Sequence, residues 1–71
     1  MMPLTMAKEG EAAEIQRVGG KEEVRRHLEI MGFVPGAKVT VISTNHGNVI
    51  VNIKESRVAI SREMANKIHV L

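Results

Sequence analysis

The second half of the chain carries aliphatic residues at every other position, and this alternation constrains the fold more than any other feature. Its members are Val39, Val41, Val49, Val51, Ile53, Val58 and Ile60. Successive side chains of a β-strand point to opposite faces, so each run of alternation indicates a strand with one buried face. Since the three runs follow one another closely, they predict three consecutive antiparallel strands joined by hairpins.

The first of these hairpins is predicted from the parity of its inward residues. On both strands the inward residues have odd numbers, so each pair across the hairpin must sum to an even number. A two-residue loop at residues 46–47 gives odd sums and breaks this rule. We therefore expect a three-residue loop at residues 45–47, with Gly47 in the left-handed position and Val41 opposite Val51.

The second hairpin changes parity, because its last strand has even-numbered inward residues. A two-residue loop at residues 55–56 satisfies the pattern and places Val58 opposite Ile53. This loop lacks the Gly or Asn that such turns favour. It also places Lys54 opposite Arg57, where like charges repel slightly.

One segment has a clear helical period. Val24, Leu28 and Met31 are spaced as i, i+4 and i+7, which predicts a helix over residues 21–31 with these three side chains on one face. Two glutamates in its first turn complement the positive end of the helix dipole. Gly32 is placed to end the helix in the left-handed conformation.

The remaining segments complete one small domain over residues 1–71. Residues 4–10 predict a short helical turn or coil, and residues 11–18 a first strand. Ser61 is placed to cap a single helical turn, and the last strand is expected around residues 68–70. This order predicts an all-β fold with minor α content: a small SH3-like five-stranded barrel. One helix follows the first strand and plugs one end, and a short helical turn precedes the last strand.

Composition removes several classes of function. The chain of 71 residues has no cysteine and a single aromatic residue, Phe33. Neither disulfides nor thiolate metal sites can therefore stabilise it, and its core must be aliphatic. One aromatic ring builds neither a proline-reading groove nor a stacking platform for nucleic-acid bases.

Charge is modest in total and uneven along the chain. The net charge is +2, with five basic and six acidic residues in positions 1–32 and five basic and two acidic residues in positions 33–71. The weak total argues against a small RNA-binding barrel. The excess in the second half predicts a modest positive face.

The segment Leu28–Gly36 resembles the signature of FeoA domains, small cytoplasmic components of bacterial ferrous iron transport. The matching positions are Leu28, Met31, Gly32, Pro35 and Gly36. The neighbouring blocks also agree in order, so the resemblance covers residues 4–71. Two positions depart from it: His27 stands where Arg is frequent, and Ile30 where a polar residue is common.

This resemblance implies an SH3-like barrel that acts with FeoB, the membrane iron permease with a cytoplasmic GTPase domain. It implies no chemistry performed by the chain itself. The sequence agrees, since it has no Asp, no Cys nucleophile and no phosphate-binding loop. We therefore expect a protein that is not an enzyme, has no catalytic residue and requires no cofactor. Its oligomeric state is left open.

Three histidines, His27, His46 and His69, are the candidate metal ligands. Their spacing supplies no chelate, so each is most simply a polar surface residue. Weak binding of a divalent transition metal such as Fe²⁺ remains open. A metal-responsive domain related to the C-terminal module of iron-dependent transcriptional repressors is accordingly the alternative function.

The candidate partner contacts are Ile30, Phe33, Lys54, Arg57 and Arg62. Ile30 lies off the helical stripe and either packs on the N-terminal segment or contacts a partner. Phe33 is either a core residue or an exposed anchor. The three basic residues either form part of the positive face or are separately solvated.

The N-terminal residues 1–6 contain neither a basic region nor the apolar run of a signal peptide, and no stretch is long enough to span a membrane. We expect a cytoplasmic protein, not itself a membrane protein and not a nucleic-acid binder. The leading hypothesis is a noncatalytic accessory protein of ferrous iron uptake that binds the cytoplasmic part of the FeoB permease.

Overall fold

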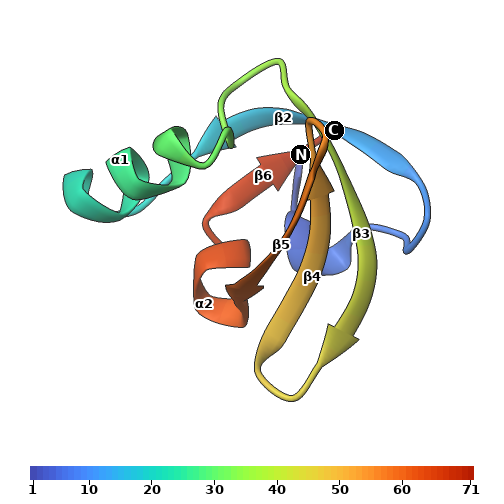
Figure 1. Ribbon diagram of the computed structural model, residues 1–71. Coiled ribbons are helices and arrows are strands. Elements are labelled where there is room, and N and C mark those ends of the chain that lie inside the picture. The colour runs from blue at the N-terminus through green and yellow to red at the C-terminus, as the bar shows by residue number, and fades with distance from the viewer.

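A computed structural model describes all residues from 1 to 71, and its strands form one antiparallel sheet wrapped around an apolar core (Figure 1). The elements are β1 (Met2–Pro3), the 3₁₀ turn η1 (Leu4–Met6), β2 (Ala12–Val18), α1 (Glu22–Ile30), β3 (Lys38–Asn45), β4 (Asn48–Ile53), β5 (Ser56–Ser61), α2 (Arg62–Ala65) and β6 (Ile68–Val70). The predicted order of strand, helix, three strands, helical turn and strand is confirmed.

The sheet has six strands in the order β1-β6-β2-β3-β4-β5. Five strands were expected, and the additional one is β1, whose Met2 and Pro3 lie opposite Val70 and His69 of β6. The sequence does not indicate β1, because two residues are too short to show alternation and proline seldom occurs within strands.

The core consists of 14 buried residues, and all of them are apolar. It contains Leu4, Ile15, Val18, Leu28, Phe33, Val39, Val41, Val49, Val51, Ile53, Ile60, Ala65, Ile68 and Val70. The expected aliphatic core with one aromatic residue is therefore present, and every inward residue of the strand pattern except Val58 is fully buried.

Helix α1 ends in a Schellman motif. The N–H of Gly32 donates to the carbonyl of Glu29 at 2.9 Å, and the N–H of Phe33 donates to the carbonyl of Leu28 at 2.9 Å. Gly32 has a φ of 105°, which a residue with a Cβ rarely adopts. Leu28 and Phe33 are both fully buried, so this end of α1 is fixed to the barrel.

The turn after α1 connects the helix to two strands. The N–H of Ala37 donates to the carbonyl of Val34 at 3.0 Å, and Gly36 has a φ of 91°, as a type II turn with Pro35 and Gly36 at its centre requires. The Gly36 N–H also donates to Ile15 of β2 at 2.8 Å. The proline and glycine therefore orient the chain from α1 into β3.

The first hairpin has a two-residue loop, so the expected three-residue loop is wrong. Asn45 lies opposite Asn48, and Gly47 has a φ of 71°. The predicted pair of Val41 and Val51 is nevertheless present, because the register shifts between Val41 and Ser43. A β-bulge at this position makes the parity change that we assigned to the loop.

The loop of the second hairpin begins one residue earlier than predicted. Its loop is Lys54–Glu55, so Ile53 lies opposite Ser56, and Val58 lies opposite Val51 rather than Ile53. The expected pairing of Lys54 with Arg57 is likewise wrong. The observed register places Ile60 opposite Val49. The predicted register would have placed the charged Arg62 opposite Val49 instead.

The last elements agree with the prediction. The Ser61 hydroxyl accepts a hydrogen bond from the Met64 N–H at 3.1 Å and thereby caps α2. Strand β6 then pairs with both β1 and β2, and its Ile68 and Val70 are fully buried.

No helix of the structure has both the length and the apolar character needed to cross a bilayer.

Candidate functional site

Helix α1 projects from the barrel and exposes most of its surface (Figure 1). Leu28 is its one fully buried residue, and Val24 is half-buried, as the helical period predicted. The helix is therefore attached mainly by its C-terminal end and does not plug the barrel along its length. Its outward side is available for contact with another molecule.

Ile30 is the most exposed large hydrophobic residue of the chain, with 80% of its surface accessible. Of the two alternatives for Ile30, packing on the N-terminal segment is therefore wrong. An isoleucine buried from water contributes about 1.5–3 kcal/mol relative to an exposed one. This contribution is not used in the isolated domain and is available to a complex.

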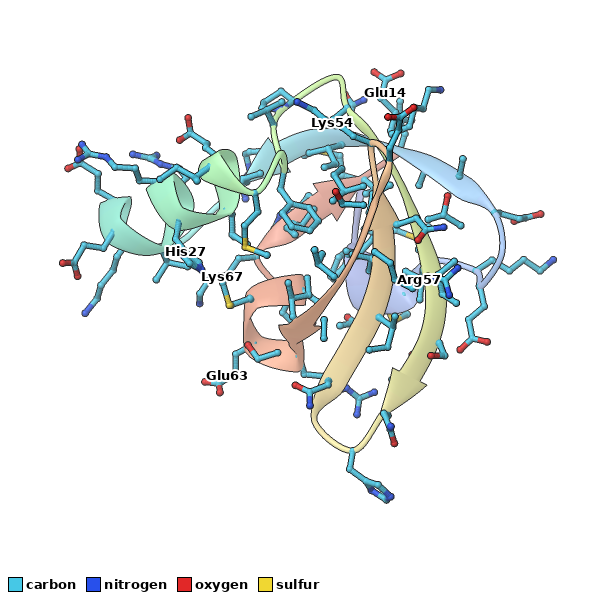
Figure 2. All side chains as sticks on the ribbon, in the orientation of Figure 1. Glu14, His27, Lys54, Arg57, Glu63 and Lys67 are labelled. Atoms are coloured by element: carbon cyan, nitrogen blue, oxygen red, sulfur yellow. The ribbon has the colours of Figure 1, made fainter.

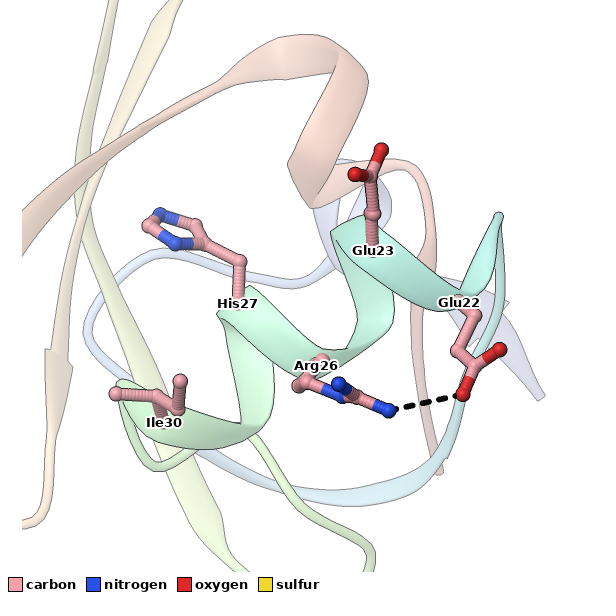
Figure 3. Close-up of a pocket in the computed structure, with 5 residues that line it drawn as sticks. All are labelled: Glu22, Glu23, Arg26, His27 and Ile30. Carbon is pink, nitrogen blue, oxygen red and sulfur yellow. Dashed lines mark hydrogen bonds and ion pairs between the residues drawn. The ribbon is translucent and has the colours of Figure 1, made fainter.

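A shallow, open depression of about 340 Å³ lies on the same side of α1 (Figure 3). Its lining residues are Glu22, Glu23, Arg26, His27 and Ile30, and we call them together the α1 face. Arg26 Nη2 lies 3.0 Å from Glu22 Oε1, and both side chains are more than 70% exposed. Such a pair stabilises a helix by only about 0.3–0.5 kcal/mol, so a ligand can exchange it readily.

Glu23 differs from Glu22 because it makes no ion pair or side-chain hydrogen bond. The α1 face therefore offers one free carboxylate, one exchangeable ion pair, an imidazole and an exposed aliphatic side chain. From the sequence, Ile30 and His27 are separate candidates, the two glutamates are expected only to complement the helix dipole, and Arg26 has no predicted role. The spacing of Glu22 and Arg26 at i and i+4 was the available signal for this surface.

Phe33 is fully buried beside the end of α1. Of the two alternatives for this residue, the core position is correct and the exposed anchor is wrong. Its N–H forms the Schellman bond to Leu28, so the side chain enters the barrel directly where the helix ends. Phe33 therefore fixes the orientation of α1 and is not accessible to a partner.

The three basic candidates are spread along β5. Lys54 precedes this strand, Arg57 lies near its start, and Arg62 follows its end (Figure 2 labels the first two). Six strand residues separate Lys54 from the start of α2, a length of about 20 Å at 3.3 Å per residue. The predicted positive face is thus not one compact patch.

Each of these basic residues has a different local role. Arg57 Nε donates to Asn52 Oδ1 across the β4–β5 pair at 3.2 Å. The backbone N–H of Arg62 donates to the carbonyl of Gly47 at 3.0 Å, which joins α2 to the first hairpin. All three side chains are exposed, so contact with a partner remains a prediction for them.

Lys54 connects the second hairpin to the end of α1. A Cβ built on Gly32 would lie 3.5 Å from Lys54 Cε, so the lysine side chain passes directly over the helix cap. A cation near the C-terminal end of a helix interacts favourably with the helix dipole. The aliphatic part of the Lys54 side chain therefore covers the end of α1.

The three histidines lie on separate elements: His27 on α1, His46 in the first hairpin loop and His69 on β6. No three His or Glu side chains are grouped so that they could hold a metal ion. His69 Nδ1 is buried and has no hydrogen-bond partner. The histidines do not form a common site in this conformation.

Comparison with known proteins identifies the family. The sequence model of the FeoA domain family matches residues 2–71 of this chain. A protein of Methanocaldococcus jannaschii named putative Fe(2+) transport protein A is 39% identical over 70 residues, which cover 99% of this chain and 85% of that protein. The chain belongs to the FeoA domain family. The resemblance of its signature segment to FeoA domains is confirmed.

Solved structures confirm the fold of this FeoA domain. A crystal structure of iron uptake regulatory protein FeoA has a TM-score of 0.89 and 27% identity, covering 99% of this chain and 93% of the other. The zinc complex of Stenotrophomonas maltophilia FeoA, described as a prokaryotic SH3 domain protein, has a TM-score of 0.85 and 21% identity, covering 99% and 89%. The predicted SH3-like fold is therefore correct.

A repressor shares this fold as well. A manganese-dependent transcriptional repressor has a TM-score of 0.87 and 18% identity, and the match covers 97% of this FeoA domain and 40% of the repressor chain. At this identity the likeness concerns the fold alone. It shows that the same barrel also occurs as one part of a longer chain.

Proposed function

We propose that this FeoA domain is a noncatalytic accessory protein of ferrous iron uptake that binds the cytoplasmic part of the FeoB-type permease. The relationship to a putative Fe(2+) transport protein A over 99% of the chain carries the proposal. The chain itself supplies an exposed apolar anchor at Ile30 and exposed basic residues on and around β5. These features support recognition of a protein surface.

Binding would act on the permease by shifting its conformational or nucleotide-dependent equilibrium. A ligand shifts such an equilibrium only by the difference between its affinities for the two states. The FeoA domain would therefore have different affinities for the GTP-bound and GDP-bound permease. Whether it stimulates or restrains transport follows from which state it prefers.

The test is a titration of the full permease in lipid nanodiscs with the FeoA domain, in the presence of GDP or a non-hydrolysable GTP analogue. We expect saturable binding with two different dissociation constants, measured by calorimetry. An unrelated membrane protein in identical nanodiscs is the control. No detectable binding in either nucleotide state would refute the proposed function.

A metal-responsive domain is the second candidate, and a specific likeness favours it. One related FeoA was crystallised with zinc, and a manganese-dependent repressor contains the same barrel. The candidate ligands here are His27, His46 and His69, which lie on separate elements. A functional site would require two copies of the chain or a rearrangement to bring them together.

Anaerobic titration with Fe²⁺ tests this second candidate. Stoichiometric binding at micromolar concentration that is lost in His27→Ala, His46→Ala or His69→Ala supports a metal-responsive role. Gln16→Ala, which changes a polar residue on β2, is a control. Binding that is weak, unsaturable and equal in all variants contradicts it.

A further inference from the structure

The α1 face combines an apolar and an anionic group at fixed spacing. Glu23 and Ile30 are seven residues apart, so they share one stripe of the helix and lie about 10.5 Å apart along its axis at 1.5 Å per residue. Arg26 and His27 lie between them on the same stripe (Figure 3). A ligand that covers the depression therefore meets both ends of this stripe.

Each end of the stripe lacks a partner within the domain. Ile30 is 80% exposed, and Glu23 makes no ion pair. Covering Ile30 requires an aliphatic group, and covering the Glu23 carboxylate requires a cation, because burial of an unpaired charge is unfavourable. The complementary ligand carries these two groups about two helical turns apart, which is the spacing of i and i+7 on an amphipathic helix.

A second copy of the same helix fits this face poorly. In an antiparallel pair centred on the stripe, Ile30 would lie opposite Glu23, and Arg26 would lie opposite His27. In a parallel pair, Glu23 would oppose Glu23 and Arg26 would oppose Arg26. The first arrangement leaves the carboxylate without a cation, and the second places like charges together.

An anionic lipid surface is also a poor match. The face carries two carboxylates and one guanidinium, and since Arg26 pairs with Glu22, its unpaired carboxylate is that of Glu23. Lipid headgroups of negative charge attract clusters of Lys and Arg instead. Charge complementarity thus selects a basic partner that also has an aliphatic residue.

We propose that the α1 face binds a basic amphipathic helix of a partner protein, which places an aliphatic residue on Ile30 and a Lys or Arg beside Glu23. This inference rests on the proposed function, because it takes the cytoplasmic part of the iron permease as the protein that supplies the helix. It adds the binding surface, the chemistry of the recognised segment and its spacing. The basic residues along β5 have no part in it.

The test measures the affinity of four single variants for the full permease in nanodiscs. Ile30→Ser removes the aliphatic anchor, and Met6→Ser is its control because Met6 is also a strongly exposed hydrophobic residue, at 70%. Glu23→Gln removes the free carboxylate, and Glu9→Gln is its control, because Glu9 is an exposed glutamate outside α1. All four positions are exposed, and thermal unfolding verifies that each variant is folded.

We expect Ile30→Ser to raise the dissociation constant about tenfold, as loss of a buried contact residue does. Glu23→Gln should raise it about threefold and flatten its dependence on NaCl concentration, since one screened charge contact is lost. The two control variants should bind as the original protein does.

Three results would overturn the proposal, and they are distinguishable. If all four variants bind the permease equally well, the α1 face is not the contact surface, while the accessory function stands. If the original protein does not bind the permease at all, both proposals fail. The inference would also be overturned if the original protein binds protein-free vesicles of phosphatidylglycerol and Ile30→Ser weakens this binding as much as it weakens binding to the permease. That result would indicate a membrane contact.

Discussion

The loop of the second hairpin contains a strained residue, and relieving the strain should stabilise the domain. Lys54 has a φ of 56°, and it is the one residue other than glycine with a positive φ. The left-handed conformation raises the free energy of a residue with a Cβ by roughly 1–2 kcal/mol, whereas glycine adopts it without this cost. The substitution Lys54→Gly removes this steric cost.

The expected gain is smaller than the strain itself. Glycine loses more backbone entropy on folding, about 0.5–1 kcal/mol relative to alanine. The Lys54 side chain is exposed, and its contact over Gly32 is a small further loss. The net stabilisation is therefore about 0.5–1 kcal/mol, which corresponds to a rise in Tm of roughly 2–8 °C for a domain of this size.

Thermal unfolding followed by far-ultraviolet circular dichroism measures this effect, since the chain has no Trp or Tyr to report by fluorescence. Glu55→Gly is the matched control in the same loop. It has the same entropic cost without a positive φ to relieve, so its Tm should fall. A Tm of Lys54→Gly at or below that of the original protein would show that the lysine contact outweighs backbone strain.

Five further substitutions test what holds the helices and the turn after α1 in place. Leu28→Ala removes a fully buried side chain at the end of α1 and should destabilise the domain by about 2–5 kcal/mol, measured as a lower midpoint of urea unfolding. Ser61→Ala removes the hydroxyl that accepts from Met64 at 3.1 Å and should cost about 1 kcal/mol, whereas Ser61→Asp should retain most of the stability. Gly32→Ala and Gly36→Ala should each cost about 1–2 kcal/mol from their positive φ. A far larger loss at Gly32, where the nearest side chains are at an ordinary 3.5 Å, would show that packing decides there instead.

The hairpins show how far an alternating pattern can predict structure. Alternation correctly selects which residues of β3, β4 and β5 face the core, because burial of the wrong face would expose aliphatic side chains. It does not distinguish a three-residue loop from a bulge at Ile42, since either one changes the parity. It also does not distinguish two registers of β4 and β5, because both keep Val58 and Ile60 inward.

Helix α1 shows the same limit for the candidate site. Its period correctly places Leu28 in the core and Ile30 off the buried stripe, since both assignments depend only on the helical repeat. The period leaves open whether Ile30 packs on the N-terminal segment or is exposed. Phe33 follows the helix, so its direction depends on the Schellman geometry and the periodicity leaves it open. The α1 face also depends on how far the helix projects from the barrel, which is a property of tertiary packing.

The signature residues and the contact residues of α1 have separate roles. Leu28, Gly32 and Phe33 end the helix and attach it to the barrel, so they determine where α1 lies. The two positions at which this chain departs from the FeoA pattern, His27 and Ile30, both line the depression on the opposite side. Attachment requires the same residues whatever the helix binds, whereas exposed residues can change without loss of stability. The signature therefore identifies the fold and the orientation of α1, whereas both departures from it lie on the surface that we propose as the contact site.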